Sequence, residues 1–286
     1  MQIDICHGWK DYELLDSGDG MRYERFGPYK TIRPDPQAIW KPSLPIIEWQ
    51  DADVRFQRTS ADKGKWLFKR HLPEKWLMHW EDLSFWVRLT SFKHTGVFPE
   101  QAIQWEFIQS KIKQTDHQPS VLNLFGYTGI ASIVAAAAGA KVTHVDASKP
   151  SITWARDNQL ASKLKDQPIR WILDDAGKFV ERELKRGNTY DAILMDPPVY
   201  GHGPTGQVWK FSENFPRLME SVSKLLTNKP LFVLVNAYAI SASSIMLGNV
   251  MQDYLPNGSM EVGELALEEQ TSHRLLSTGI FGRWSA

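Results

Sequence analysis

A glycine turn is the first feature of this sequence whose residue types and spacing suit chemistry. Residues 121–125 are mostly apolar and predict a strand, residues 130–138 are Ala-rich and predict a helix, and two glycines lie between them. Glycine lets the backbone turn tightly and approach a ligand closely. We therefore predict that a nucleotide-type ligand contacts the turn, which comprises Phe125, Gly126, Tyr127, Thr128 and Gly129.

Asp146 follows Gly129 by 17 residues and ends a second predicted strand. In dinucleotide-binding folds, an acid at the end of the second strand accepts hydrogen bonds from the ribose hydroxyls. The alternatives are a generic strand-to-helix turn and a surface acid that caps the next helix near Ser148. The position after the second strand favours the ribose.

Two further acids, Asp174 and Asp175, follow the third predicted strand and precede Ala176. They suit the N-cap and the first turn of a helix, where side-chain oxygens and negative charge are stabilising. One of the two carboxylates also suits the exocyclic amine of adenine, and the sequence does not choose between them. Asp174, Asp175 and Ala176 are therefore expected on the side of the bound nucleotide.

Asp196, Pro197 and Pro198 form the most discriminating motif. Prolines donate no backbone hydrogen bond, so the chain is expected to leave the sheet stiffly at this point. The Asp196 carboxylate and the Pro197 carbonyl then become fixed acceptors that hold an amine or amide N–H and align its nitrogen for attack. The Gly-rich loop 200–210 has aromatic residues near both ends, which suits stacking on a planar acceptor and equally a mobile lid. The predicted catalytic residues are Asp196, Pro197 and Tyr200.

These residues need a scaffold that gathers strand ends, and the pattern after residue 119 predicts one. Strands alternate with helices, which is typical of an α/β fold with a mostly parallel sheet and helices on both faces. In such a Rossmann-like fold, ligands bind beyond the carboxyl ends of the strands. Seven strands are expected, at residues 121–125, 141–146, 169–173, 190–196, 230–235, 263–267 and 279–284, and helices at 130–138, 149–163, 176–186, 213–226 and 241–252.

The first 90 residues follow a different pattern. Short strand-like segments are broken by Gly and Pro, and eight of the twelve Trp residues precede the glycine turn. This pattern predicts a small, mainly β appendage. Pro99 suits the first turn of a helix that runs to about Gln114 and connects the appendage to the rest. We expect two domains, residues 1–90 and 91–286.

Composition limits the partners and the compartment. The formal net charge is zero, so any contact with nucleic acid or an anionic membrane must be local. The single cysteine, Cys6, excludes an intramolecular disulfide and a cysteine cluster for zinc, which fits a reducing compartment. Residues 1–10 carry charges and lack the apolar region of a targeting signal. We expect a cytoplasmic protein without a membrane span or a metal.

The sequence resembles the S-adenosylmethionine-dependent methyltransferase family related to the large-subunit ribosomal RNA methyltransferases of the cytosine-C5 type. The resemblance implies a class I methyltransferase fold and S-adenosylmethionine as the ligand of the glycine turn and Asp146. In similar proteins the segment that matches residues 95–101 lies against the cofactor, which implies that Phe98 and Glu100 contact it here. Besides the glycine turn, the resemblance rests on residues 12–20, 24–27, 33–40, 94–101, 196–201 and 263–265.

One departure from that family concerns the methylated atom. Methylation of cytosine C5 needs a thiolate that attacks C6 of the base, and relatives that do this carry a cysteine after the fourth or fifth strand. Residues 196–200 and 236–239 contain none, and the whole appendage separates Cys6 from both segments in the sequence. A nitrogen acceptor is therefore favoured.

RNA is the predicted substrate. Residues 63–70 interleave four cations with two aromatic residues, which suits phosphates and stacked bases, although such a segment also suits a solvated hairpin. The zero net charge keeps two alternatives open, a small-molecule or protein N-methyltransferase and a catalytically silent cofactor-binding module. A dinucleotide-dependent oxidoreductase is disfavoured, because the turn lacks a full G-x-G-x-x-G motif.

Overall fold

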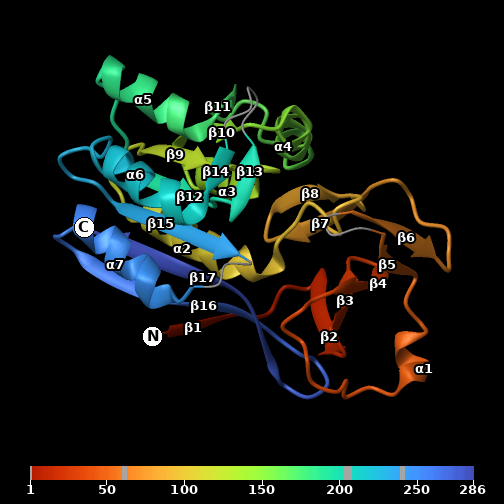
Figure 1. Ribbon diagram of the computed structural model, residues 1–286. Helices are drawn as coiled ribbons and strands as arrows, with labels where there is room; N and C mark the ends of the chain where they lie inside the picture. The colour runs from red at the N-terminus through yellow and green to blue at the C-terminus, as the bar shows by residue number, and fades with distance from the viewer. Residues whose placement is uncertain (1, 60–62, 203–207, 239–241) are drawn as a thin grey trace. The chain divides into compact units, whose positions relative to one another are not determined.

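The computed structural model describes residues 2–59, 63–202, 208–238 and 242–286 (Figure 1). Their contacts group into two compact units. The core unit comprises Met1–Asp4, Gln104–Leu265 and Thr278–Ala286, and the N-terminal unit comprises Ile5–Ile103 and Ala266–Ser277. This grouping differs from a single cut after residue 90, because residues 91–103 and 266–277 group with the N-terminal unit. The two domains 1–90 and 91–286 stay a prediction.

An eight-stranded sheet organises the core unit, in the order β1-β16-β17-β15-β12-β9-β10-β11. The five strands from β15 to β11 are parallel to one another, whereas β17 is antiparallel to β15. Parallel strands with both faces covered are apolar along their whole length, which is why every residue of β12 is buried. The strands are β1 (Gln2–Cys6), β9 (Ser120–Leu124), β10 (Lys141–Asp146), β11 (Ile169–Leu173), β12 (Ala192–Met195), β15 (Phe232–Tyr238), β16 (Ser259–Glu268) and β17 (Leu275–Ser285).

Helices cover both faces of this sheet (Figure 1). Buried side chains of α5, α6 and α7 form one apolar cluster with the strands, whereas α3 and α4 contact β10 and β11 and each other. Within the described part of the chain, no helix has both the length and the apolar character that a membrane crossing requires. The helices are α2 (Ala102–Lys113), α3 (Ile130–Ala137), α4 (Lys149–Ala161), α5 (Ala176–Arg186), α6 (Phe211–Ser223) and α7 (Ser244–Tyr254).

The predicted α/β class and the mostly parallel sheet are confirmed, with one strand more than the seven expected. The additional strand is β1, which joins the sheet beside β16. Its buried Asp4 forms an ion pair with the equally buried Arg283 of β17, so this N-terminal segment contributes a charge to the interior. Pairing between the two ends of a chain is set by tertiary structure, and no local pattern in residues 2–6 indicates it.

The N-terminal unit contains a five-stranded sheet in the order β2-β3-β4-β5-β6 and a hairpin of β7 and β8. Only β4 and β5 are parallel within this sheet. The predicted helix after Pro99 begins as a 3-10 turn, η1 (Pro99–Gln101), and continues as α2. The remaining elements are β2 (Tyr12–Gly18), β3 (Met21–Phe26), β4 (Tyr29–Pro34), α1 (Ile46–Trp49), β5 (Val54–Arg58), β6 (Gly64–Phe68), β7 (Trp76–Trp80) and β8 (Leu83–Val87).

A buried ionic cluster lies on one face of the five-stranded sheet. Glu24 is fully buried and accepts two hydrogen bonds from the Arg33 guanidinium, each 2.7 Å long. The Tyr12 hydroxyl donates a third hydrogen bond at 2.8 Å, and the Arg22 Nε lies 3.4 Å from the same carboxylate. A buried charge needs such partners, because removal from water is costly for each ion.

Candidate functional site

The carboxyl ends of the parallel strands lie level with one another. Leu124 is opposite Val145 on one side and Met195 on the other, and Met195 is opposite Val235. The chain order reverses at β9, which has β10 on one side and β12 on the other. Adjacent strands lie about 4.8 Å apart, so the ends of β10 and β12 are separated by roughly 10 Å. Asp146 and the segment that begins at Asp196 therefore occupy the same edge of the sheet.

The glycine turn after β9 has an unusual backbone. Phe125, Tyr127 and Gly129 have φ values of 57°, 50° and 77°, in the left-handed region that favours glycine. For Phe and Tyr this conformation is uncommon, and it persists only where surrounding contacts enforce it. One such contact is the backbone hydrogen bond from Gly126 to Val145 at 3.2 Å. Left-handed residues of this kind cluster at ligand-binding sites.

Asp146 is tied to the glycine turn by direct hydrogen bonds. Its Oδ2 accepts from the backbone N–H of Tyr127 and its Oδ1 from that of Ser148, both at 2.8 Å. The carboxylate thus fixes the turn, whereas the N-cap of α4 is Ser148, whose side chain accepts from the backbone N–H of Ser151. Burial raises the pKa of Asp146, and the two backbone hydrogen bonds oppose that rise.

Three buried polar side chains form a hydrogen-bonded series beside the turn. Asn123 donates to the Ser132 hydroxyl at 2.8 Å, and that oxygen lies 2.9 Å from Nδ1 of His144. Complete burial lowers the pKa of His144 to about 3, so the imidazole is neutral. No role was predicted for these residues. Asn123, a polar side chain between Leu122 and Leu124, is a signal that could have indicated one, whereas His144 follows Thr143 in a strand of mixed polarity and gives no such signal.

Gly126 leaves no space for a larger residue. A Cβ at this position would lie 2.3 Å from Cε1 and 2.5 Å from Nδ1 of His144. We therefore expect Gly126→Ala to lower the free energy of unfolding by about 1–3 kcal/mol, as overpacking does elsewhere. Urea denaturation would measure the loss. Gly201→Ala is the matched control, since its Cβ would meet only Pro198 Cγ at 3.4 Å, and equal destabilisation by both variants would contradict the explanation.

The acids after β11 have separate local roles. Asp175 is the N-cap of α5 and accepts from the backbone N–H of Lys178 at 3.0 Å, as the capping alternative predicted. Asp174 accepts from the backbone N–H of Asp175 and forms an ion pair with Arg182. Ala176 is buried at the first position of α5. Contact of any of the three with adenine stays a prediction.

The segment after β12 continues into a hairpin rather than an open loop. Its strands are β13 (Tyr200–His202) and β14 (Val208–Lys210), and residues 203–207 of the predicted loop lie outside the described residues. Pro197 is buried and Tyr200 is 57% exposed. Contact of Tyr200 with a substrate stays a prediction.

Trp209 connects this hairpin to the glycine turn. Its indole N–H donates to the Pro198 carbonyl at 2.5 Å, and its ring centroid lies 5.0 Å from that of Phe125. No role was predicted for Trp209 itself, although aromatic residues near both ends of the loop were expected to matter. Trp209, which comes after both segments in the sequence, therefore bridges Pro198 of the Asp-Pro-Pro segment and Phe125 of the turn.

Asn236 lies in β15, the strand beside β12, directly after Val235, which is opposite Met195. It is 6% exposed, and its Oδ1 has no hydrogen-bond partner among the residues that the structure describes. A buried acceptor without a partner is unfavourable unless something else donates to it. Asn236 is therefore a further candidate for contact with a ligand.

Phe98 and Glu100 belong to the N-terminal unit. Phe98 directly precedes η1, and Glu100 is its second residue. The Phe98 ring contacts the His94 ring at a centroid distance of 5.5 Å. Glu100 is 2% exposed, and within the described ranges its Oε2 has no hydrogen-bond partner. Burial raises the pKa of its carboxyl group, and the Arg22 charge opposes that rise. Their contact with the cofactor stays a prediction.

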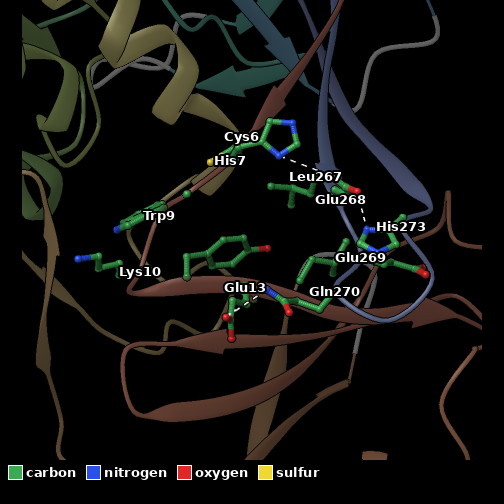
Figure 2. Close-up of a pocket in the computed structure, with 13 residues that line it drawn as sticks. Cys6, His7, Trp9, Lys10, Glu13, Leu267, Glu268, Glu269, Gln270 and His273 are labelled. Carbon is green, nitrogen blue, oxygen red and sulfur yellow. Dashed lines mark hydrogen bonds and ion pairs between the residues drawn. The ribbon is translucent and has the colours of Figure 1, made fainter.

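A separate pocket of about 370 Å³ lies within the N-terminal unit (Figure 2). Figure 2 shows Glu268 between the imidazoles of His7 and His273, whose Nδ1 atoms are 3.4 and 2.8 Å from its oxygens. Cys6 also lines this pocket, and none of the predicted site residues does. Over the described ranges, no group of three or more His, Cys, Asp or Glu residues is arranged to hold a metal ion.

Comparisons with known proteins show the family and the fold of this chain. Residues 48–253 match the model of the S-adenosylmethionine-dependent methyltransferase family. The whole chain aligns with 93% of the SAM-dependent methyltransferase from Agrobacterium tumefaciens, with 43% identity and a TM-score of 0.97. A structure of SMU.776 complexed with SAH shares the fold, with 18% identity and a TM-score of 0.73 over 96% of this chain and 75% of that one.

Two curated relatives are similar to part of this chain. The ribosomal RNA large subunit methyltransferase K/L of Pseudoalteromonas atlantica is 32% identical over 195 residues, which are 67% of this chain and 26% of that protein. A second protein of the same name, from Shewanella loihica, is 30% identical over 183 residues, 60% of this chain and 25% of that protein. The chain spans about a quarter of the length of these relatives.

Proposed function

Because the chain belongs to the S-adenosylmethionine-dependent methyltransferase family, we propose that it methylates a nitrogen atom of a base in RNA. The observation that carries the proposal is the direct link between Asp146 and the glycine turn, at the sheet edge where Asp196 also begins its segment. Ribosomal RNA is the proposed RNA, because the curated relatives are named for it. We also propose the cytoplasm as the compartment.

The residues of the turn fit the cofactor. The backbone of residues 125–129 approaches it closely, Asp146 accepts hydrogen bonds from the ribose hydroxyls, and Asp174 or Asp175 accepts one from the adenine amine. S-adenosylmethionine supplies an electrophilic methyl group on a sulfonium sulfur. Phe98 and Glu100 complete the proposed cofactor contacts. Burial raises the pKa of Asp146, which means that its charged form is incompletely compensated. Hydrogen bonds from the ribose hydroxyls would stabilise that charged form, which supports the proposed contact.

The acceptor side is proposed to work by alignment. The Asp196 carboxylate and the Pro197 carbonyl accept hydrogen bonds from the exocyclic N–H groups, which directs the nitrogen lone pair toward the methyl carbon. Tyr200 stacks on the base, and the carboxylate of Asp196 takes the proton that the nitrogen loses. The absence of any cysteine other than Cys6 supports nitrogen, because attack on a pyrimidine carbon needs a thiolate at the site.

Asp146→Ala tests the cofactor site. We expect calorimetry to show S-adenosylmethionine affinity about 10- to 100-fold weaker than in the wild type, since charge-assisted hydrogen bonds contribute about 1.5–3 kcal/mol. Wild-type affinity should also weaken as the pH falls through the raised pKa of Asp146, because protonation removes the acceptor. Asp253→Ala, on the exposed surface of α7, is the control. Equal binding by Asp146→Ala and wild type would contradict the assignment.

Transfer from a labelled methyl donor to total RNA tests the substrate. We expect label in RNA, and in a base nitrogen after nucleoside analysis. Label confined to small molecules or protein would instead support the second candidate, a small-molecule or protein N-methyltransferase, which the zero net charge favours. Cofactor binding without any transfer would indicate a silent module.

A further inference from the structure

A groove of about 440 Å³ lies on the face of the five-stranded sheet opposite the buried ionic cluster, within the N-terminal unit. Side chains alternate between faces along a strand, and paired residues share a face. Arg55 pairs with Leu67 and also with Ile32, so these three residues lie on one face, and all three line the groove. Val54 and Phe56 point to the other face, where they are buried.

The groove has apolar walls that are held in place. Trp49 lines it and packs on Tyr23 at a centroid distance of 5.4 Å and an interplanar angle of 30°. The Trp49 indole N–H donates to Asp16 at 2.9 Å, and the backbone N–H groups of Ser43 and Leu44 donate to the same buried carboxylate. The wall is therefore preorganised, and a ligand would not have to order it.

Apolar side chains are also exposed around this groove. Ile46 is 72% exposed and Leu67 is 43% exposed, and both line it. They form an accessible apolar surface over the buried Trp49, beside charged residues. Exposed apolar patches rimmed by polar groups mark binding sites more often than ordinary surface does.

The charged residues that line the groove are two cations and one acid. Of the cations on β5 and β6, Arg55 and Lys65 lie on the face that carries the groove, whereas Arg58 lies on the opposite face. Arg55 and Lys69 line the groove together with one carboxylate, Asp19. Arg70 is neutralised by Asp51 and Asp53, whereas Arg55 and Lys65 form no ion pair with any residue that the structure describes. This surplus of positive charge is complementary to phosphates.

We propose that this groove binds an unstacked base of a single-stranded RNA segment, with Arg55 and Lys69 contacting the flanking phosphates. The proposal rests on the RNA substrate proposed above and assigns a second contact site to that substrate. A single strand is inferred because a base enters an apolar groove only when it is free of its helix. The surplus of cations selects RNA over an apolar peptide as the occupant.

Neighbouring residues on opposite faces of the same strands provide matched variants. Leu67 and Phe68 are consecutive and similarly exposed, at 43% and 57%, but only Leu67 lines the groove. Arg55 and Arg58 are exposed arginines of β5, and only Arg55 lines the groove. The test measures fluorescence anisotropy of a short labelled single-stranded RNA, alone and annealed to its complement, over a range of salt concentrations.

We expect Arg55→Ala to weaken single-strand binding and to reduce the salt slope by about 0.7, because the variant neutralises one phosphate fewer. Leu67→Ser should weaken single-strand binding about 3- to 10-fold, at the lower end of the effect of removing one stacked side chain, and leave duplex binding unchanged. Arg58→Ala and Phe68→Ser should match the wild type. Circular dichroism and S-adenosylmethionine binding would show that each variant is folded.

Three outcomes overturn the inference, and they do so in two different ways. If the wild type binds and methylates RNA while Arg55→Ala and Leu67→Ser behave as it does, the groove has another occupant, such as a protein segment, and only the groove assignment fails. The same conclusion follows if Phe68→Ser weakens binding as much as Leu67→Ser does. If the folded wild type binds S-adenosylmethionine but neither binds nor methylates RNA, the proposed substrate fails and the groove assignment fails with it.

Discussion

Replacement of Asp196 by asparagine should lower kcat for methyl transfer by about 10²- to 10³-fold, the loss that follows removal of one preorganised polar group from other active sites. The carboxylate is proposed both to align the acceptor nitrogen and to take its proton. Asparagine keeps the shape of the side chain but removes the charge, and its amide group donates where an acceptor is needed. Affinity for S-adenosylmethionine should stay within about threefold of the wild type, because Asp146 and the turn are unchanged.

Single-turnover kinetics with saturating cofactor would measure this effect, and calorimetry would measure cofactor affinity in the same variant. Asp253→Asn, on the exposed surface of α7, is the control for loss of one carboxylate. A variant that keeps wild-type kcat would show that Asp196 does not act on the acceptor. A variant that loses cofactor binding would instead place Asp196 on the cofactor side.

Glu24→Ala should lower the free energy of unfolding by about 3–5 kcal/mol, the usual consequence of removing one partner from a buried ion pair. The substitution leaves the buried guanidinium of Arg33 without the carboxylate that accepts two of its hydrogen bonds. The Tyr12 hydroxyl loses its acceptor as well. Urea denaturation monitored by tryptophan fluorescence would measure the loss, and Glu48→Ala, on the exposed surface of α1, is the control.

The contribution of Glu24 should depend on pH. Burial alone would raise its pKa, but the charges of Arg22 and Arg33 and the hydrogen bonds from Arg33 and Tyr12 lower it below its ordinary value. A group whose pKa is lower in the folded state contributes stability that is complete above its unfolded pKa of about 4.3. That contribution is lost as the pH falls through the folded pKa. The stability difference between wild type and Glu24→Gln should therefore narrow in acid, and a difference that widens would contradict this sign.

Several parts of the site were predictable because they depend on local features. Gly126 and Gly129 between an apolar strand and an Ala-rich helix indicate a tight turn in any context, and the spacing to Asp146 follows from one helix and one strand. The helix predicted at 176–186 has the same bounds in the structure, because Asp175 and Gly187 are strong capping residues. Strand and helix alternation alone indicated a parallel sheet.

Other contacts join residues that are distant in the sequence. Trp209 contacts Phe125 across 84 positions, and His144 supports a turn that belongs to another strand. Neither contact has a periodic pattern, because each depends on which strands become neighbours in the sheet. The segment 200–210 was predicted as a loop, because neither of its two arms has the pattern of a strand. The two arms form a hairpin only because they pair with each other in the folded chain.

The sequence by itself determined the α/β class, the glycine turn and the acids at the strand ends, because periodicity, glycine and capping act over a few residues. Only the tertiary structure decided that β1 joins the large sheet, that Asp146 binds the turn directly, and that one face of the N-terminal sheet forms a groove. The physical reason is that strand neighbours, register and side-chain burial are properties of the assembled chain, and no single segment carries them.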